Sequence, residues 1–134
     1  MKSPILSIVF PLFNEVDNLP DLYAAVQPVA TDLSGGAYEL VFVDDGSQDG
    51  SFEIVKRLHL KDKRVRGISF ARNFGHQTAL LAGLKAARGE VVISMDADLQ
   101  HPPEVIRDLY AKYQEGYDIV NTCLLYTSPS PRDS

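Results

Sequence analysis

Short apolar runs alternate along the chain with longer segments that have helical periodicity. The apolar runs are nearly continuous, which is typical of strands buried on both faces of a sheet. The expected strands cover Ile5–Phe10, Leu40–Val43, Ile68–Phe70 and Val91–Met95, with a shorter fifth run at Asp118–Val120. Strands that alternate with helices through short connections predict an α/β fold, in which a mostly parallel sheet carries helices on both faces.

Four helices are expected between these strands. The first begins after Asn18, which is a plausible cap, and Pro28 should end or kink it. Asp49 is expected to cap the second helix. The other three helices are expected at Phe52–Leu60, Thr78–Ala87 and Pro102–Tyr113.

Composition limits the classes of protein that the sequence allows. The 134 residues fit one domain, and a hydrophobic content of 45% suits a modest core. A net charge of −5 argues against a general nucleic-acid or anionic-membrane surface, although a local phosphate site is compatible with it. The single cysteine, Cys123, rules out an internal disulfide or a cysteine metal cluster. No apolar run approaches the roughly 20 residues that span a bilayer, and no signal peptide is recognisable, so we expect a soluble, cytoplasmic chain.

The C-terminal segment differs from the rest of the sequence. From Thr127 it is polar and rich in Ser and Pro without periodicity, which predicts disorder. The segment Cys123–Ser134 resembles translated adapter sequence, and a natural flexible terminus is the alternative. We therefore predict an incomplete domain at residues 1–122, followed by a non-native or disordered tail at residues 123–134.

Each of the four main strands ends in a cluster of polar residues. Ligands of parallel sheets bind at the carboxyl ends of the strands, so the four clusters should meet on one rim. This convergence is stronger evidence for a site than any one motif. The clusters lie at Pro11–Glu15, Asp44–Gly50, Ala71–Gln77 and Asp96–His101.

Asp96 and Asp98 are the candidate metal ligands. Residues i and i+2 of an extended chain project to the same side, and two carboxylates about 4 Å apart repel by roughly 4 kcal/mol at an effective dielectric of about 20. A divalent cation relieves that repulsion, and oxygen ligands suit Mg²⁺ or Mn²⁺. Gln100 can add an amide oxygen. The alternative is that one of the two aspartates only caps the helix that follows.

The other clusters offer groups for a nucleotide. Asp44 and Asp45 can accept hydrogen bonds from a base or a ribose, although Asp-Gly-Ser is also ordinary turn chemistry. Glu15 can bind the same groups or be a solvated loop acid, and Phe13 can stack on a base or simply pack. Arg72 can offer a guanidinium fork to a diphosphate or form a surface ion pair.

Three further polar side chains face the same rim in this arrangement, namely His76, Gln77 and His101. A lone histidine in such a place is more often structural or solvent-exposed than a ligand. The sequence lacks the glycine-rich dinucleotide fingerprint, the P-loop and the nucleophile elbow, which argues against the corresponding enzyme classes.

In order and spacing, the four motifs resemble the inverting GT-A glycosyltransferases of family 2. The last two resemble in particular the branch that acts on polyprenyl and dolichol phosphates. The resemblance covers about residues 5–120. Its motifs are PLFNE at Pro11–Glu15, DDGSQDG at Asp44–Gly50, RNFGHQ at Arg72–Gln77 and DADLQHPPE at Asp96–Glu104.

The resemblance implies a GT-A, Rossmann-like fold and a set of roles. Nucleotide-sugar binding is expected of Pro11, Phe13, Glu15, Asp44, Asp45, Arg72 and Asp96. Asp96, Asp98 and Gln100 are expected to organise Mg²⁺ or Mn²⁺ on the diphosphate, and Asp98 is expected to contribute to catalysis. Acceptor-site and further catalytic residues, and membrane helices in many bacterial members, follow this stretch in the family.

The expected reaction transfers a sugar, with inversion, from a UDP- or GDP-linked donor to a polyprenyl phosphate. The acceptor oxygen is already ionised near neutral pH, so no strong general base is needed. The parent protein is expected at the cytoplasmic face of the membrane, and the fragment alone is expected to be inactive. The alternatives are a nucleotide-sugar-binding module without turnover, a sugar-phosphate nucleotidyltransferase and a phospho-accepting receiver domain.

Overall fold

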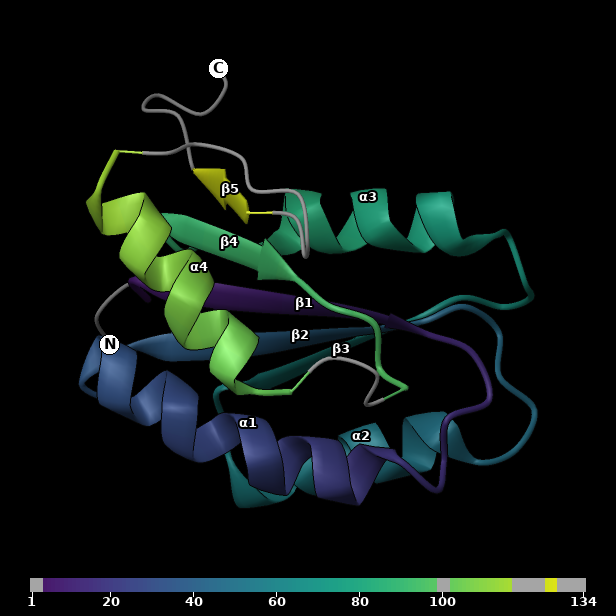
Figure 1. Cartoon of the computed structure of the whole chain (residues 1–134). Helices are drawn as coiled ribbons and strands as arrows, with labels where there is room; N and C mark the ends of the chain where they lie inside the picture. The colour runs from purple at the N-terminus through teal and green to yellow at the C-terminus, as the bar shows by residue number, and fades with distance from the viewer. Residues whose placement is uncertain (1–3, 99–101, 117–124, 128–134) are drawn as a thin grey trace.

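A five-stranded sheet forms the centre of the molecule. The computed structural model describes residues 4–98, 102–116 and 125–127, the last three by their backbone only. The strand order is β3-β2-β1-β4-β5, in which the first four strands are parallel and β5 pairs antiparallel with β4 (Figure 1). The strands are β1 (Leu6–Leu12), β2 (Tyr38–Asp44), β3 (Val65–Ser69), β4 (Val91–Ser94) and β5 (Leu125–Thr127). The expected α/β fold with a mostly parallel sheet is confirmed.

Helices cover both faces of the sheet. Three of them lie on one face and α3 lies on the other (Figure 1). The helices are α1 (Leu19–Ser34), α2 (Ser51–Lys61), α3 (His76–Ala86) and α4 (Glu104–Gln114). None of the helices in the described part of the chain is long and apolar enough to cross a membrane.

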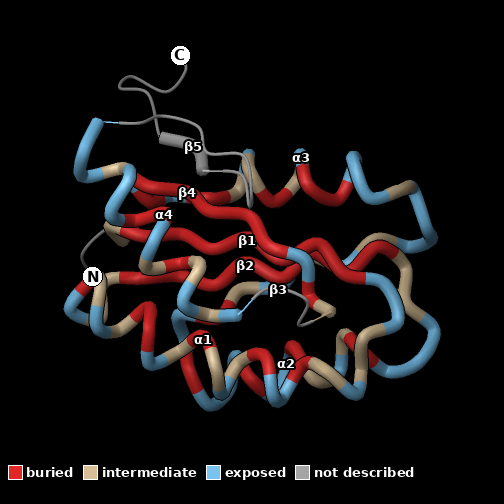
Figure 2. The backbone as a smooth tube through the Cα atoms, viewed as in Figure 1, coloured by how far each residue is buried: buried red, intermediate tan, exposed pale blue. Residues whose placement is uncertain are grey.

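The two central strands are buried along their whole length, as their continuous apolar sequence predicts. Every residue of β1 and β2 is buried (Figure 2). Phe10 of β1 and Phe42 of β2 stack with their ring centroids 4.9 Å apart on the side of the three helices. Val9 and Val43 point to the opposite face and pack in the smaller cluster under α3. The strands therefore hold the loops that follow them on a rigid base.

Of the two effects expected of Pro28, ending the first helix does not occur, and a kink stays a prediction. Helix α1 runs through Pro28 to Ser34 and ends at Gly35, which has a left-handed φ of 65°. Proline removes one backbone donor from the helix, but Val26 and Val29 on either side of it are buried in the core. Since most helix stability in proteins comes from packing an apolar face, this packing outweighs the missing hydrogen bond.

Several expected boundaries also shift. β2 and β3 begin earlier than predicted, at Tyr38 and Val65. Asn18 lies at the cap position of α1 but makes no capping hydrogen bond with its side chain. Strand β5 lies within the segment predicted to be a tail, and the boundary at residue 122 stays a prediction. The expected strand at Asp118–Val120 lies outside the described residues.

Candidate active site

The loops that follow β1, β2, β3 and β4 meet at one edge of the sheet. Asp45 donates its backbone N–H to the carbonyl of Leu12 at 2.9 Å, and Phe70 donates to the carbonyl of Asp44 at 2.9 Å. These bonds extend the parallel ladder into the loops. The loops enclose a cleft of about 330 Å³. The cleft is lined by Pro11, Leu12, Phe13, Glu15, Asp45, His76, Ala79, Asp96, Ala97 and Asp98.

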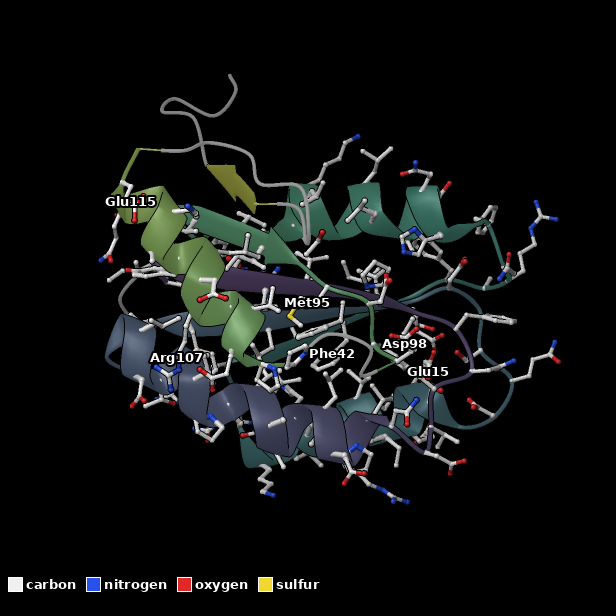
Figure 3. All side chains as sticks on the ribbon, in the orientation of Figure 1. Glu15, Phe42, Met95, Asp98, Arg107 and Glu115 are labelled. Carbon is white, nitrogen blue, oxygen red and sulfur yellow. The ribbon has the colours of Figure 1, made fainter. Side chains whose placement is uncertain are left out.

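Asp96 and Asp98 both line this cleft, just after β4. The side chain of Asp96 is 51% exposed, and its Oδ1 lies 3.3 Å from Nε2 of His76. Asp98 is half-buried, and Ala97 between the two is buried. In Figure 3, Asp98 lies at the same end of the sheet as Glu15, which follows β1. The predicted convergence of acids from separate strands is thus present for these residues.

The donor set of the cleft fits a hard divalent cation. Asp96 and Asp98 offer carboxylate oxygens, which Mg²⁺ and Mn²⁺ favour, and these cations commonly complete their shell with water and substrate phosphate. Within the described ranges, no group of three or more His, Cys, Asp or Glu side chains forms a ready-made metal site. Gln100, the third predicted ligand, lies outside the described residues. The metal-binding role of these residues stays a prediction.

Asp45 is buried and fastens a neighbouring loop. Its Oδ1 accepts the backbone N–H of Phe74 at 2.7 Å, and its Oδ2 accepts that of Gly75 at 3.1 Å. These two residues directly precede α3. A carboxylate that accepts such bonds fixes the loop backbone, so Asp45 supports the cleft wall as well as lining it.

The side chain of Asp44 makes a contact within its own turn, which is one of the two roles that the sequence suggests for it. Its Oδ1 accepts the N–H of Ser47 at 2.9 Å, and Asp44 is absent from the lining of the cleft. Gly46 has a φ of 80°, and a Cβ there would overlap the backbone of Arg72 and Asn73. The second and third loops therefore need glycine at this position to pack together. The predicted nucleotide contact of Asp44 is untested.

Side chains of the second loop and of the first residue of α2 hold the first loop in place. Asn14, with a φ of 54°, donates its N–H to Oγ of Ser47 at 2.7 Å, and Glu15 donates to Oγ of Ser51 at 3.0 Å. Val16 donates to Asp49 at 3.2 Å. The small burial of Asp49 opposes its ionisation, but hydrogen bonds from Ser51 and Val16 outweigh burial and lower the pKa of Asp49.

This arrangement presents Phe13 and Glu15 to the cleft. Phe13 is 44% exposed, which leaves its ring accessible to a planar ligand. One carboxylate oxygen of Glu15 accepts a hydrogen bond from the amide of Asn18 at 2.7 Å, which orients the side chain. Pro11 also lines the cleft.

The side chain of Arg72 contacts the ring of Phe74. Its guanidinium lies 4.8 Å from the ring centroid of Phe74, over the ring face, and it is absent from the residues that line the cleft. His76 lines the cleft, Gln77 is exposed outside the lining, and His101 lies outside the described residues. The predicted contact of Arg72 with a diphosphate stays a prediction.

The sequence did not single out the small residues of the cleft. Ala79 and Ala97 line it and leave room for a ligand, since neither carries a side chain beyond Cβ. Ala79 is one turn into α3, and only the burial pattern of that helix indicates that it faces the sheet.

The sequence of this chain is similar to those of known glycosyltransferases. The sequence model described as "Glycosyl transferase family 2" matches residues 7–133. Over 114 residues the chain is 46% identical to an uncharacterized glycosyltransferase, YkcC, of Bacillus subtilis, covering 85% of this chain and 35% of the relative. Over 118 residues it is 46% identical to an undecaprenyl-phosphate 4-deoxy-4-formamido-L-arabinose transferase of Shewanella sediminis, covering 87% and 35%. The chain thus spans about a third of the length of these relatives.

Solved structures share the fold. A mannosyltransferase of Pyrobaculum calidifontis, solved with GDP-Man and Mn²⁺, superposes with a TM-score of 0.73 at 21% identity, covering 88% of this chain and 34% of the other. TarS of S. aureus, solved with UDP-GlcNAc, superposes with a TM-score of 0.67 at 26% identity, covering 82% and 31%. The fold resembles that of GT-A glycosyltransferases, and the match of the family model over almost the whole chain shows that this protein belongs to glycosyl transferase family 2.

Proposed function

We propose that this chain is the donor-binding part of a transferase that moves a sugar from a UDP- or GDP-linked donor to a polyprenyl phosphate, with inversion at the anomeric carbon. One observation carries the proposal: Glu15, Asp45, Asp96 and Asp98, from three separate loops, line a single cleft at the carboxyl ends of parallel strands. An acidic cleft repels an anionic diphosphate unless a cation joins the two.

The names of the similar proteins support the chemical classes. The mannosyltransferase was solved with GDP-Man and Mn²⁺, and TarS with UDP-GlcNAc. Several relatives are named undecaprenyl-phosphate sugar transferases. These names favour a nucleotide sugar as donor, a divalent metal as cofactor and a polyprenyl phosphate as acceptor.

Each residue of the cleft has a task in this proposal. Asp96 and Asp98 hold Mg²⁺ or Mn²⁺, which supplies Lewis-acid stabilisation of the charge on the leaving diphosphate. The exposed ring of Phe13 stacks on the nucleotide base, and Glu15 accepts hydrogen bonds from base or ribose. Asp45 keeps the wall formed by Phe74 and Gly75 in position.

The acceptor phosphate needs little activation. Its second pKa is about 6, so its oxygen is ionised near neutral pH and attacks the anomeric carbon from the side opposite the diphosphate. We propose that the residues that bind this acceptor belong to the part of the relatives that this chain does not span. The isolated chain should therefore bind the donor without transferring the sugar, and the parent protein should act at the cytoplasmic face of a membrane.

Donor binding tests the proposal directly. Isothermal titration calorimetry with UDP, GDP and their sugars is carried out with Mn²⁺ and with EDTA, on the unsubstituted chain and on Asp98→Ala. We expect binding that needs Mn²⁺ and that falls at least about a hundredfold in Asp98→Ala, because a metal ligand is lost. Gln77→Ala, exposed and outside the cleft, is the matched control. Binding that ignores both Mn²⁺ and Asp98 would refute the metal assignment.

A further inference from the structure

We propose that His76 is a binding residue for the diphosphate of the nucleotide sugar, to which its imidazole donates a hydrogen bond. This inference rests on the proposed function, since it names one more contact in the same cleft. The lining of the cleft is acidic. Four of the described lining side chains are carboxylic acids, and His76 is the one basic side chain among the described residues of the cleft.

The position of His76 suits a ligand contact better than a structural role. Its side chain is 62% exposed, so packing does not hold it. Its Nε2 lies 3.3 Å from Oδ1 of Asp96, which is a long contact for a hydrogen bond. The imidazole thus lies beside a predicted metal ligand without being tightly bound to it. A ligand that engages Asp96 frees the ring to donate to a neighbouring oxygen.

The backbone under His76 is fixed, although its side chain is exposed. Asp45 accepts the N–H groups of Phe74 and Gly75, the two residues before His76. His76 is also the first residue of α3, and helix N-termini favour anions. Asp45 thus fixes the backbone just before His76, and Asp96, from a separate loop, lies beside its ring.

The proposal does not require a charged imidazole. A neutral histidine keeps one ring N–H, and that donor suffices for a phosphate oxygen. Hydrogen bonds to charged groups are the stronger kind, so the loss of this one is expected to weaken binding of the diphosphate about tenfold. The affinity for the nucleoside, which has no diphosphate, should not change.

Three variants test the role of His76. His76→Ala removes the donor, His76→Gln keeps an N–H donor on a neutral side chain, and Gln77→Ala changes the exposed neighbour outside the cleft. Calorimetry with Mn²⁺ gives the affinities for UDP and GDP, and NMR titration gives those for uridine and guanosine. Thermal unfolding checks that each variant is folded, and titration with Mn²⁺ alone isolates any effect through Asp96.

We expect His76→Ala to bind UDP or GDP about tenfold more weakly, with unchanged affinity for the nucleoside and for Mn²⁺ alone. His76→Gln should recover part of the loss, and Gln77→Ala should behave like the unsubstituted chain. The inference is overturned if His76→Ala binds UDP and GDP normally, or if nucleoside binding falls equally, which indicates a change of loop shape. If the unsubstituted chain binds neither UDP nor GDP with Mn²⁺, the proposed function itself fails, and that result is visible without any variant.

Discussion

Acidic residues at the two ends of the parallel strands, here the amino edge and the carboxyl edge, have opposite surroundings. At the amino edge, Glu39 and Asp62 are buried. Glu39 accepts hydrogen bonds from Ser7, Arg66 and the N–H of Arg88, each at 2.6 Å. These donors satisfy the buried charge, so the acid fastens strands and leaves nothing for a ligand.

Asp62 is satisfied in the same way. Tyr23 and Tyr38 both donate to its Oδ2, at 2.8 and 2.7 Å, and the N–H of Arg64 donates to its Oδ1 at 3.0 Å. At the carboxyl edge, by contrast, Asp96 is half exposed beside a histidine at 3.3 Å. Burial and the supply of donors therefore distinguish an acid that holds the fold from one that can bind a cation.

The largest effect on stability is expected from Glu39. Glu39→Ala leaves Arg66 without its carboxylate partner and leaves the hydroxyl of Ser7 without its acceptor. The pair is partly buried, since the side chain of Arg66 is 28% exposed, so we expect a cost of about 3 kcal/mol, the low end for buried pairs. Chemical denaturation should show this loss of unfolding free energy, with Glu53→Ala, an exposed acid of α2, as the control. A change below about 0.5 kcal/mol would mean that the amino edge does not depend on this network.

Asp45 should give the next largest effect on stability. It lies at the carboxyl edge, but like the acids of the amino edge it is buried and accepts hydrogen bonds. Asp45→Ala leaves the N–H groups of Phe74 and Gly75 without their acceptor, at a cost of about 2 kcal/mol. Asp45→Asn keeps one acceptor oxygen and should lose about half as much. Equal stability of the two variants and the unsubstituted chain would show that Asp45 is not needed to hold the loop.

Asp62 should make stability depend on pH by a smaller amount. Burial raises the pKa of Asp62, but hydrogen bonds from Tyr38, Arg64 and Tyr23 outweigh burial and lower it below the ordinary 3.8. A lowered folded-state pKa gives stability that is present above the unfolded pKa and is lost as the pH falls from about 4 through the folded value. The unfolding free energy should therefore fall less steeply below about pH 4 in Asp62→Asn than in the unsubstituted chain.

The control for this experiment is Asp17→Asn, which changes an exposed aspartate of the first loop. This substitution should leave the decrease of the unfolding free energy at low pH unchanged. Identical curves for Asp62→Asn and the unsubstituted chain would contradict the hydrogen-bonded role of Asp62.

Asp96 should have the smallest effect on stability. Its side chain is half exposed, and no strand depends on its contact with His76. Asp96→Asn should therefore stay within about 0.5 kcal/mol of the unsubstituted chain in chemical denaturation. A loss as large as that of Glu39→Ala would mean that Asp96 is structural, and the contrast between the two edges would fail.

The sequence predicts the sheet better than it predicts the details of the loops. Continuous apolar runs located β1, β2 and β4, because strands buried on both faces need apolar residues throughout. The expected run at Ile68–Phe70 overlaps only the end of β3, which is partly exposed and carries Arg66 and Gly67.

Local propensity suggests that Pro28 can end α1, but the burial of this helix outweighs it and the helix continues to Ser34. The network of Glu39 was invisible because its partners, Ser7 and Arg88, are 32 and 49 residues away along the chain.

The candidate site shows the same limit. The positions of Asp96 and Glu15 at one rim follow from parallel strands, which the sequence reveals. The hydrogen bond from Phe74 to Asp45 joins two loops, and Arg72 contacts Phe74 within one loop. Both depend on side-chain packing, which no spacing in the sequence encodes.

Direct binding of Mn²⁺ tests the central claim that Asp96 and Asp98 at the carboxyl edge bind a divalent cation and that the buried acids of the amino edge do not. Electron paramagnetic resonance follows free Mn²⁺ during titration of the unsubstituted chain, Asp98→Asn and Asp62→Asn, with UDP present. The account predicts that Asp98→Asn loses Mn²⁺ binding while Asp62→Asn keeps it. Equal binding by all three proteins, or loss in Asp62→Asn alone, would contradict the account.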